Sequence, residues 1–484
     1  MLFHTWVFLL FFAIVYAVYL PLRKHNAAMN LWLMLASYFF YGWWNPYYLL
    51  LLFGTSAIDY WLVRGMERSG SHRAKKAWLV TSLVSNFGFL GFFKYSYFIT
   101  GNLNAILAHL GASFQLPDPV AYPNAMLHAF GASDASLFTH VLLPIGISFH
   151  TFQSMSYTID AYRGTIAIER SFVRFLCFVS FFPQLVAGPI ERARNLLPQL
   201  QRAPRITRAD LTEGLSHFLV GYFKKVALAD YLAMYVDQVY GAPGDAGAPA
   251  LLLATLAFGW QIYFDFSGYT DMARGLAMTM GFRLMLNFNN PYTATGLGDF
   301  WARWHISLST WFKDYVYFPL GGNRDGKWRT YRNMLLTMVI SGVWHGAAWT
   351  FVIWGALHAL GRVVTRELEE TAFYRERVPR LAKQLGVFAF VSLAWIFFRA
   401  PTLDDAGTIV MRLFTSGWTD PHFPLLMAVL ILAVWIYELV FANQSRVRNV
   451  LALAPVRFGL AAAMIAYLAV VAQHSSQAFI YFQF

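Results

Sequence analysis

The sequence predicts an all-α membrane protein that crosses the bilayer many times. Of its 484 residues, 58% are hydrophobic and 13% are charged, whereas soluble domains are about 45–50% apolar and about 25% charged. Several windows reach the roughly 20 apolar residues that a membrane-spanning helix needs. Lysines and arginines gather in short loops between these windows, as the positive-inside rule expects of cytoplasmic loops.

The same observations exclude other classes of protein. The formal net charge of +12 follows from the loop lysines and arginines, so it indicates topology and not a nucleic-acid partner. Cys177 is the single cysteine, which excludes an intrachain disulfide and a Cys-x-x-Cys metal site. The first apolar segment has no basic stretch before it and no small-residue cleavage site after it, so we expect it to be retained as a helix.

Ten apolar runs are expected to cross the membrane. They lie near residues 3–20, 28–44, 47–63, 77–100, 140–159, 214–236, 251–269, 384–399, 424–441 and 456–473.

The charges of the loops predict the orientation of these spans. The strongly basic loop 64–76 and the basic stretch 191–210 are expected in the cytoplasm, and residues 101–139, which contain no Lys or Arg, are expected outside. Ten crossings with both termini outside fit this alternation, so the C-terminus is predicted to be periplasmic.

Two further apolar stretches, 172–190 and 334–360, have basic sequence on both sides. Both are therefore predicted to be re-entrant or hairpin segments that enter the membrane and return. Non-helical backbone at that depth is tolerated only where protein buries it or where it lines a cavity. Residues 277–332, between these stretches, have no clean apolar run of 20 residues. Asn-Pro-Tyr and Gly-Gly-Asn break helices there. Asp299 is a candidate cap for a helix that carries Trp301, Trp304 and His305.

His345 lies within the second of these segments, in "SGVWHGAAW". One interpretation is a packed histidine between helices, with Gly342 and Gly346 forming a small-residue packing face. The other is functional, since ionisable residues inside a membrane are rare and face a bundle interior or a wet cavity. A buried imidazole in its neutral form is a general base for a hydroxyl nucleophile.

His305, in "RWHISLSTW", is open to the same two interpretations: a residue packed among tryptophans, or a polar group that orients substrate or stabilises charge on a carbonyl oxygen. His358 is expected to be structural. Asp59 is expected to pair with Arg64 at a helix end.

Asp265 and Asp271, near a predicted helix end, either line a cavity or form a cap. Phosphate-loop, nucleophile-elbow and zinc-helix motifs are absent from the sequence.

Four motifs occur in order along most of the chain: residues 143–164, 181–193, 286–324 and 341–355. Together they resemble the membrane-bound O-acyltransferase superfamily, and more narrowly its bacterial alginate O-acetyltransferase branch. The resemblance implies one transmembrane domain over residues 1–484, with core motifs at about 140–360, in which a helical bundle surrounds a central pore. It also implies a multi-pass protein of the bacterial inner membrane, surrounded by lipid.

The resemblance also implies roles for particular residues. The essential histidine of the superfamily corresponds to His345, and the second polar position corresponds to His305. Substrate- or donor-lining positions of the pore are then expected at Gln153, Asn289, Asp299, Arg303, Trp304 and Trp344. His150 stands where relatives more often carry an aromatic residue.

The C-terminal "FIYFQF" (479–484) is either an apolar tail anchored at the interface or a counterpart of a terminal motif in this branch whose tyrosine carries the acyl group. By that analogy Tyr481 relays acetyl outward as an ester, with His345 as its base.

The function that the resemblance implies is acetyl transfer from a cytoplasmic donor, acetyl-CoA, to a hydroxyl outside. The product is an O-acetylated exopolysaccharide such as alginate, or another envelope polymer, and the expected partner is a periplasmic SGNH-type acetyltransferase or polysaccharide-modification complex. The polysaccharide is the acceptor, directly or through that partner. No metal is expected. From composition alone, a transporter or channel for a small solute or polysaccharide precursor fits equally well, and a scaffold for an envelope complex is the third alternative.

Overall fold

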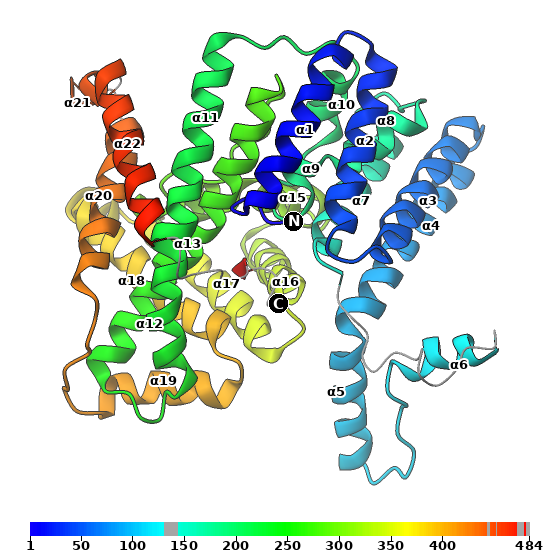
Figure 1. The fold of residues 1–484 in the computed structure, drawn as a ribbon. Helices are drawn as coiled ribbons and strands as arrows, with labels where there is room; N and C mark the ends of the chain where they lie inside the picture. Colours follow the sequence, from blue (N-terminus) through cyan, green and yellow to red (C-terminus); the bar gives the residue numbers. More distant parts are fainter. Residues whose placement is uncertain (130–143, 443–445, 452, 472–478, 481–484) are drawn as a thin grey trace.

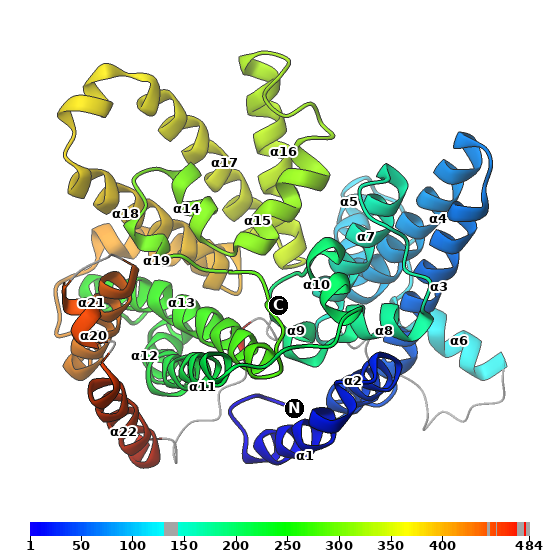
Figure 2. The ribbon, with the colours of Figure 1, turned by 90° about the horizontal axis from the view of Figure 1, so that it is seen from above.

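The computed structural model describes residues 1–129, 144–442, 446–451, 453–471 and 479–480, and these residues contain helices and no strands. Figure 2 shows the helices arranged around a central region. The N-terminal half consists of α1 (Trp6–Leu22), α2 (Asn26–Gly42), α3 (Tyr48–Arg68), α4 (His72–Leu90), η1 (Gly91–Tyr95), α5 (Ser96–His109), α6 (Ala121–Ala129), α7 (Ile147–Arg163), α8 (Phe172–Ser180), α9 (Phe182–Leu185), α10 (Ala193–Leu200), α11 (Arg208–Phe223), η3 (Lys224–Ala229) and α12 (Asp230–Gly241).

The C-terminal half begins with the longest described helix, α13, of 32 residues. It consists of α13 (Ala248–Thr279), η4 (Pro291–Thr293), α14 (Leu297–Arg303), α15 (Ile306–Phe312), η5 (Lys313–Tyr317), α16 (Lys327–His345), α17 (Trp349–Glu370), η6 (Phe373–Arg377), α18 (Arg380–Arg399), α19 (Leu403–Thr415), α20 (Leu425–Ala442), α21 (Arg446–Leu451) and α22 (Ala454–Val471).

Three described helices, α3, α13 and α18, are long and apolar enough to cross a membrane, and α1, α20 and α22 are shorter apolar helices. The predicted runs near 3–20, 28–44 and 384–399 coincide with α1, α2 and α18 to within a few residues. The run near 251–269 covers only the first part of α13, which continues to Thr279 because polar residues of its second half are buried against other helices.

The two stretches predicted to be re-entrant are interrupted helices. α8 and α9 have 9 and 4 residues, so even α8 is about 13 Å long against a hydrocarbon core of about 30 Å. Residues 334–360 form parts of α16 and α17, which are separated by the three residues Gly346 to Ala348.

Glycines allow α16 and α17 to pack closely. A Cβ placed on Gly342 would lie 2.2 Å from the carbonyl oxygen of Phe351, and one on Gly355 would lie 2.4 Å from that of Met338. These distances leave no room for a side chain, as at other small-residue helix crossings in membranes. The hairpin brings the end of α16 into the middle of the molecule (Figure 2).

Candidate acyl-transfer site

His345 is the last residue of α16, and its side chain is 4% exposed. Its ring centroid lies 5.1 Å from that of Trp354 in α17 and 5.2 Å from that of Phe398 in α18. The imidazole therefore lies at the break of the α16–α17 hairpin, inside an aromatic enclosure.

His305 immediately precedes α15 and is fully buried. Its backbone adopts a left-handed conformation, with φ 42° and ψ 55°, which is uncommon for a residue other than glycine. The helix predicted to carry Trp301, Trp304 and His305 ends at Arg303 instead, so that interpretation was wrong. Asp299 does lie in the first turn of α14, where its carboxylate accepts from the backbone N–H of Thr295 at 3.2 Å.

Trp344 brings the two histidines together. Its ring centroid lies 4.9 Å from that of His345 and 6.4 Å from that of His305. Phe149 of α7 lies against both His305, at 6.0 Å, and Trp344, at 5.5 Å. Residues 40 positions apart in the sequence thus share one aromatic cluster.

Asn287 holds the backbone around His305. Its carbonyl oxygen accepts from the N–H of Ile306 at 2.9 Å, and its side-chain oxygen accepts from the N–H and hydroxyl of Ser307 at 3.2 and 2.9 Å. The Ser307 hydroxyl also accepts from the N–H of Ile190, at 3.0 Å, which ties the turn to the segment after α9. Sequence reasoning singled out Asn289 and missed Asn287.

Lys94 of η1 binds the C-terminal end of α16, next to His345. Its ammonium donates to the carbonyl oxygens of Trp344, at 2.7 Å, and His345, at 2.9 Å, while the Tyr95 hydroxyl donates to that of Val343 at 3.0 Å. The last carbonyls of a helix have no partner within it, and a positive charge at that end is favourable. Lys94 was also missed, because a lone lysine in an apolar run carries no pattern.

Three predicted site residues form a separate group with one another. Asp299 and Arg303 form an ion pair at 2.6 Å, Arg303 Nη1 donates to the Asn289 carbonyl oxygen at 3.4 Å, and the Asn289 N–H donates to the Arg303 carbonyl oxygen at 2.9 Å. These interactions join the segment before η4 to α14.

Gln153 donates to the carbonyl oxygen of Phe178 at 2.7 Å and so ties α7 to α8. Trp304 is 1% exposed and packs against Trp395 of α18, with ring centroids 5.2 Å apart. His358 is fully buried, with its ring centroid 4.8 Å from that of Trp354. Tyr481 lies outside the described residues.

The C-terminal segment nevertheless reaches the site through Phe479 and Ile480. Both are buried, and the ring centroid of Phe479 lies 5.8 Å from that of Phe266, which lies 4.5 Å from that of His305. The Ile480 N–H donates to the carboxylate of Asp265 at 2.7 Å. In Figure 1 these two residues are the short red segment in the middle of the molecule.

The buried carboxylates match the sequence predictions only in part, since Asp271 lines a cavity, one of the two alternatives predicted for it. Asp59 does not pair with Arg64; it is fully buried and accepts from Ser82 at 2.6 Å and from Asn86 at 2.9 Å. Asp265 forms an ion pair with Lys225 at 2.7 Å from within α13 and caps no helix.

A cavity of about 360 Å³ lies between α14, α15, η5 and the α16–α17 hairpin, and His345 itself does not line it. Ser341, one helical turn before His345 and therefore on the same face of α16, lies in its wall. Lys313, Arg362 and Arg366 are among the residues around it. We call this space the hairpin cavity. The described residues contain no group of three or more His, Cys, Asp or Glu side chains that could hold a metal ion.

Comparison with known proteins identifies the family of the chain. A family model of MBOAT, the membrane-bound O-acyltransferase family, matches residues 166–400. The chain is 40% identical over 420 residues to the probable alginate O-acetylase AlgI of Pseudomonas aeruginosa, which covers 86% of this chain and 75% of that protein. The chain belongs to the membrane-bound O-acyltransferase family.

Other relatives of this O-acyltransferase are named for different envelope polymers. The peptidoglycan O-acetyltransferase of Helicobacter pylori is 35% identical over 437 residues, covering 84% of this chain and 78% of that protein. The teichoic acid D-alanyltransferase of Bacillus subtilis is 32% identical over 225 residues, covering 45% and 57%. Membership of the family makes the chain a membrane acyltransferase that uses an acyl donor, and it decides against the transporter and scaffold alternatives.

Proposed function

We propose that this O-acyltransferase moves an acetyl group from acetyl-CoA in the cytoplasm to a hydroxyl outside the inner membrane, for O-acetylation of an exopolysaccharide such as alginate or another envelope polymer. The observation that carries the proposal is the convergence on one aromatic cluster of three parts of the chain: His345, His305 and the described residues of the C-terminal tail. The names of the relatives support an envelope polymer as the final acceptor.

The hairpin cavity suits a thioester with a charged carrier. Lys313 is exposed at its edge, with Arg362 and Arg366 nearby, while Trp301, Leu308 and Ser341 line its wall. Cationic side chains at the edge would attract the phosphates of CoA, and the wall would receive the less polar pantetheine arm. The basic stretch 324–332, which includes the start of α16, adds positive charge on the same expected cytoplasmic side.

The chemistry at the histidines is general-base catalysis of acyl transfer. His345 takes the proton of the attacking hydroxyl, the hydroxyl oxygen bonds to the thioester carbonyl carbon, and the C–S bond breaks. The proton then passes from His345 to the leaving thiolate. His305 orients the acceptor or stabilises the oxygen of the tetrahedral intermediate.

The acceptor hydroxyl is that of Tyr481 or of the external acceptor itself. Phe479 and Ile480 bring the chain to within two residues of Tyr481 while already packed beside the neighbours of His305. An acetyl ester on Tyr481 would then be handed to a periplasmic SGNH-type acetyltransferase, with the C-terminus on the periplasmic side.

Radiolabelled acetyl-CoA offered to the protein in proteoliposomes tests the proposal. Label should appear on the protein or on an added acceptor, and His345→Ala should abolish it, while His109→Ala, an exposed histidine on α5, should not. Label that remains on the protein in Tyr481→Phe would exclude the relay through that tyrosine. Full turnover by His345→Ala would contradict the assignment of the base.

A further inference from the structure

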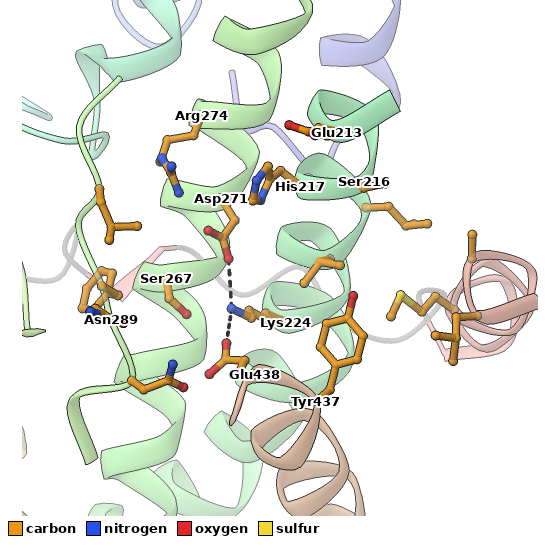
Figure 3. A pocket seen from close by; sticks show the side chains of 18 of the residues that line it. Glu213, Ser216, His217, Lys224, Ser267, Asp271, Arg274, Asn289, Tyr437 and Glu438 are labelled. Atoms are coloured by element: carbon orange, nitrogen blue, oxygen red, sulfur yellow. Dashed lines mark hydrogen bonds and ion pairs between the residues drawn. The ribbon is translucent and has the colours of Figure 1, made fainter. Parts of the chain in front are cut away.

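A second cavity, apart from the two histidines, lies between α11, α13, α20 and α22 (Figure 3). Its volume is about 550 Å³, within the range of small-molecule sites. Neither His345 nor His305 lines it. We call it the lateral cavity.

Two carboxylates of the lateral cavity share one lysine. Lys224, 5% exposed, lies 2.9 Å from the carboxylate of Asp271 and also pairs with that of Glu438 (Figure 3). The Tyr263 hydroxyl donates to Glu438 at 2.6 Å. This bridge joins η3, α13 and α20. With Glu213, Arg274 and Arg457, the lysines and arginines that line the cavity equal its carboxylates in number, which suits a ligand that carries both charges.

Two arginines of the same cavity have no carboxylate within ion-pair distance in the described part of the chain. Arg274 Nε is buried and has no hydrogen-bond partner there. Arg457 is exposed and donates to the hydroxyl of Ser216 at 2.8 Å. Charged groups in or near a bilayer are normally paired, so a cavity with two guanidinium groups that lack a carboxylate favours an anion, and guanidinium matches phosphate geometry well.

The apolar side chains of the lateral cavity lie mainly on α11 and α22, and polar side chains line it at several depths. Arg457 lies near the start of α22 and Arg274 near the end of α13, both on the side of the basic stretch 191–210 that is expected in the cytoplasm. Ser216, which binds Arg457, lies midway along α11. Val220 and Met464 line the cavity deeper along α11 and α22. This order matches an amphiphile whose headgroup is at the cytoplasmic face.

We propose that the lateral cavity binds one phospholipid of the cytoplasmic leaflet through its phosphate, with Arg274 and Arg457 as the phosphate-binding residues. The acyl chains lie along the apolar walls of α11 and α22. Glu213, an exposed carboxylate that also lines the cavity, opposes a second negative charge and accepts an ammonium group. The headgroup therefore carries an amine, as phosphatidylethanolamine does.

Native mass spectrometry of the delipidated full-length protein tests this site. Phosphatidylethanolamine should bind with one tight site per chain, tighter than phosphatidylglycerol and much tighter than diacylglycerol, which has no phosphate. The double substitution Arg274→Gln, Arg457→Gln should weaken binding of phosphatidylethanolamine about tenfold or more, because it removes both charge-assisted hydrogen-bond donors. Arg329→Gln, which removes one exposed arginine outside the cavity, is the matched control and should bind as wild type does.

Two further measurements distinguish a lipid phosphate from a soluble phosphate and test the site without relying on a variant that could misfold. Millimolar inorganic phosphate should not displace the lipid; displacement would mean a site for a soluble phosphate and would overturn the lipid assignment. A photoactivatable phosphatidylethanolamine should label peptides of α11 or α22 in the wild-type protein, which needs no variant. Equal binding of diacylglycerol, or labelling elsewhere alone, would overturn the proposal.

Discussion

Substituting Gly342 by alanine tests whether the close packing of the α16–α17 hairpin positions His345. The added Cβ would lie 2.2 Å from the carbonyl oxygen of Phe351, where ordinary contact begins at 3.4 Å, so the helices must separate by about 1.2 Å at that point. The neighbour is backbone and cannot rotate away. His345 follows three residues later on the same helix.

The expected change in the free energy of unfolding of Gly342→Ala combines two opposing effects. Overpacking a tight interface costs about 1–3 kcal/mol, and a clash with backbone belongs at the upper end. Replacing glycine by alanine inside a helix returns about 0.5–1 kcal/mol. We therefore expect Gly342→Ala to destabilise the protein by roughly 2 kcal/mol, and to lower acetyl transfer on the order of 100-fold, because a 1 Å displacement of a catalytic group has that effect.

The assay compares initial rates of transfer from labelled acetyl-CoA with thermal unfolding in the same detergent. Gly386→Ala in α18 is the matched control, because a Cβ there meets nothing within 4 Å; it should keep its rate and unfold at the same or a slightly higher temperature. If Gly342→Ala folds and transfers acetyl at the wild-type rate, the close packing of the hairpin does not position His345.

Three other substitutions test the surroundings of the site. Lys94→Met removes two hydrogen bonds to the end of α16, so it should destabilise the protein by up to about 1.5–3 kcal/mol for each of these charge-assisted hydrogen bonds and lower turnover. Lys76→Met, at an exposed lysine, should do neither. An unchanged turnover in Lys94→Met would contradict the role of Lys94 in positioning. Glu191, in the basic stretch 191–210, has a pKa raised to about 7 by burial. Since its pKa in the unfolded chain is about 4.3, the folded state should lose stability as pH rises from about 4.3 to 7. In unfolding scans from pH 5 to 8, Glu191→Gln should lack this part of the dependence of stability on pH. An unaltered slope would show that another group titrates. Lys225→Met leaves the buried carboxylates of Asp230 and Asp265 without their shared ammonium. Chemical denaturation should show a destabilisation of about 3–5 kcal/mol. A value below about 1 kcal/mol would mean that the carboxylates are already neutral.

Much of the fold follows from local pattern. The apolar runs predict α1, α2 and α18 closely, because a membrane helix is recognised by its own length and composition. α13 is underestimated, because Asp271 and Arg274 end the apolar run although Asp271 is paired with Lys224 of η3. Pairing across helices depends on tertiary structure and has no signal in the local sequence.

The candidate site divides in the same way. His345 and His305 were recognised from motifs, and the structure places both against Trp344. Asn287 and Lys94, which hold the backbone on either side, act through carbonyl and amide groups of distant residues. A residue that supports backbone elsewhere in the chain needs no particular neighbours in sequence, so no motif reveals it.

The backbone at His305 argues that its side chain has a function. A left-handed conformation costs a residue with a Cβ about 1–3 kcal/mol, a cost that glycine avoids. Glycine would satisfy the turn before α15, and the hydrogen bonds of Asn287 would remain, because they join Ile306 and Ser307. What glycine would lack is the imidazole against Trp344 and Phe266. The strain is therefore explained by the ring, and a ring held at that cost beside a second buried histidine supports the role in acyl transfer proposed for His305.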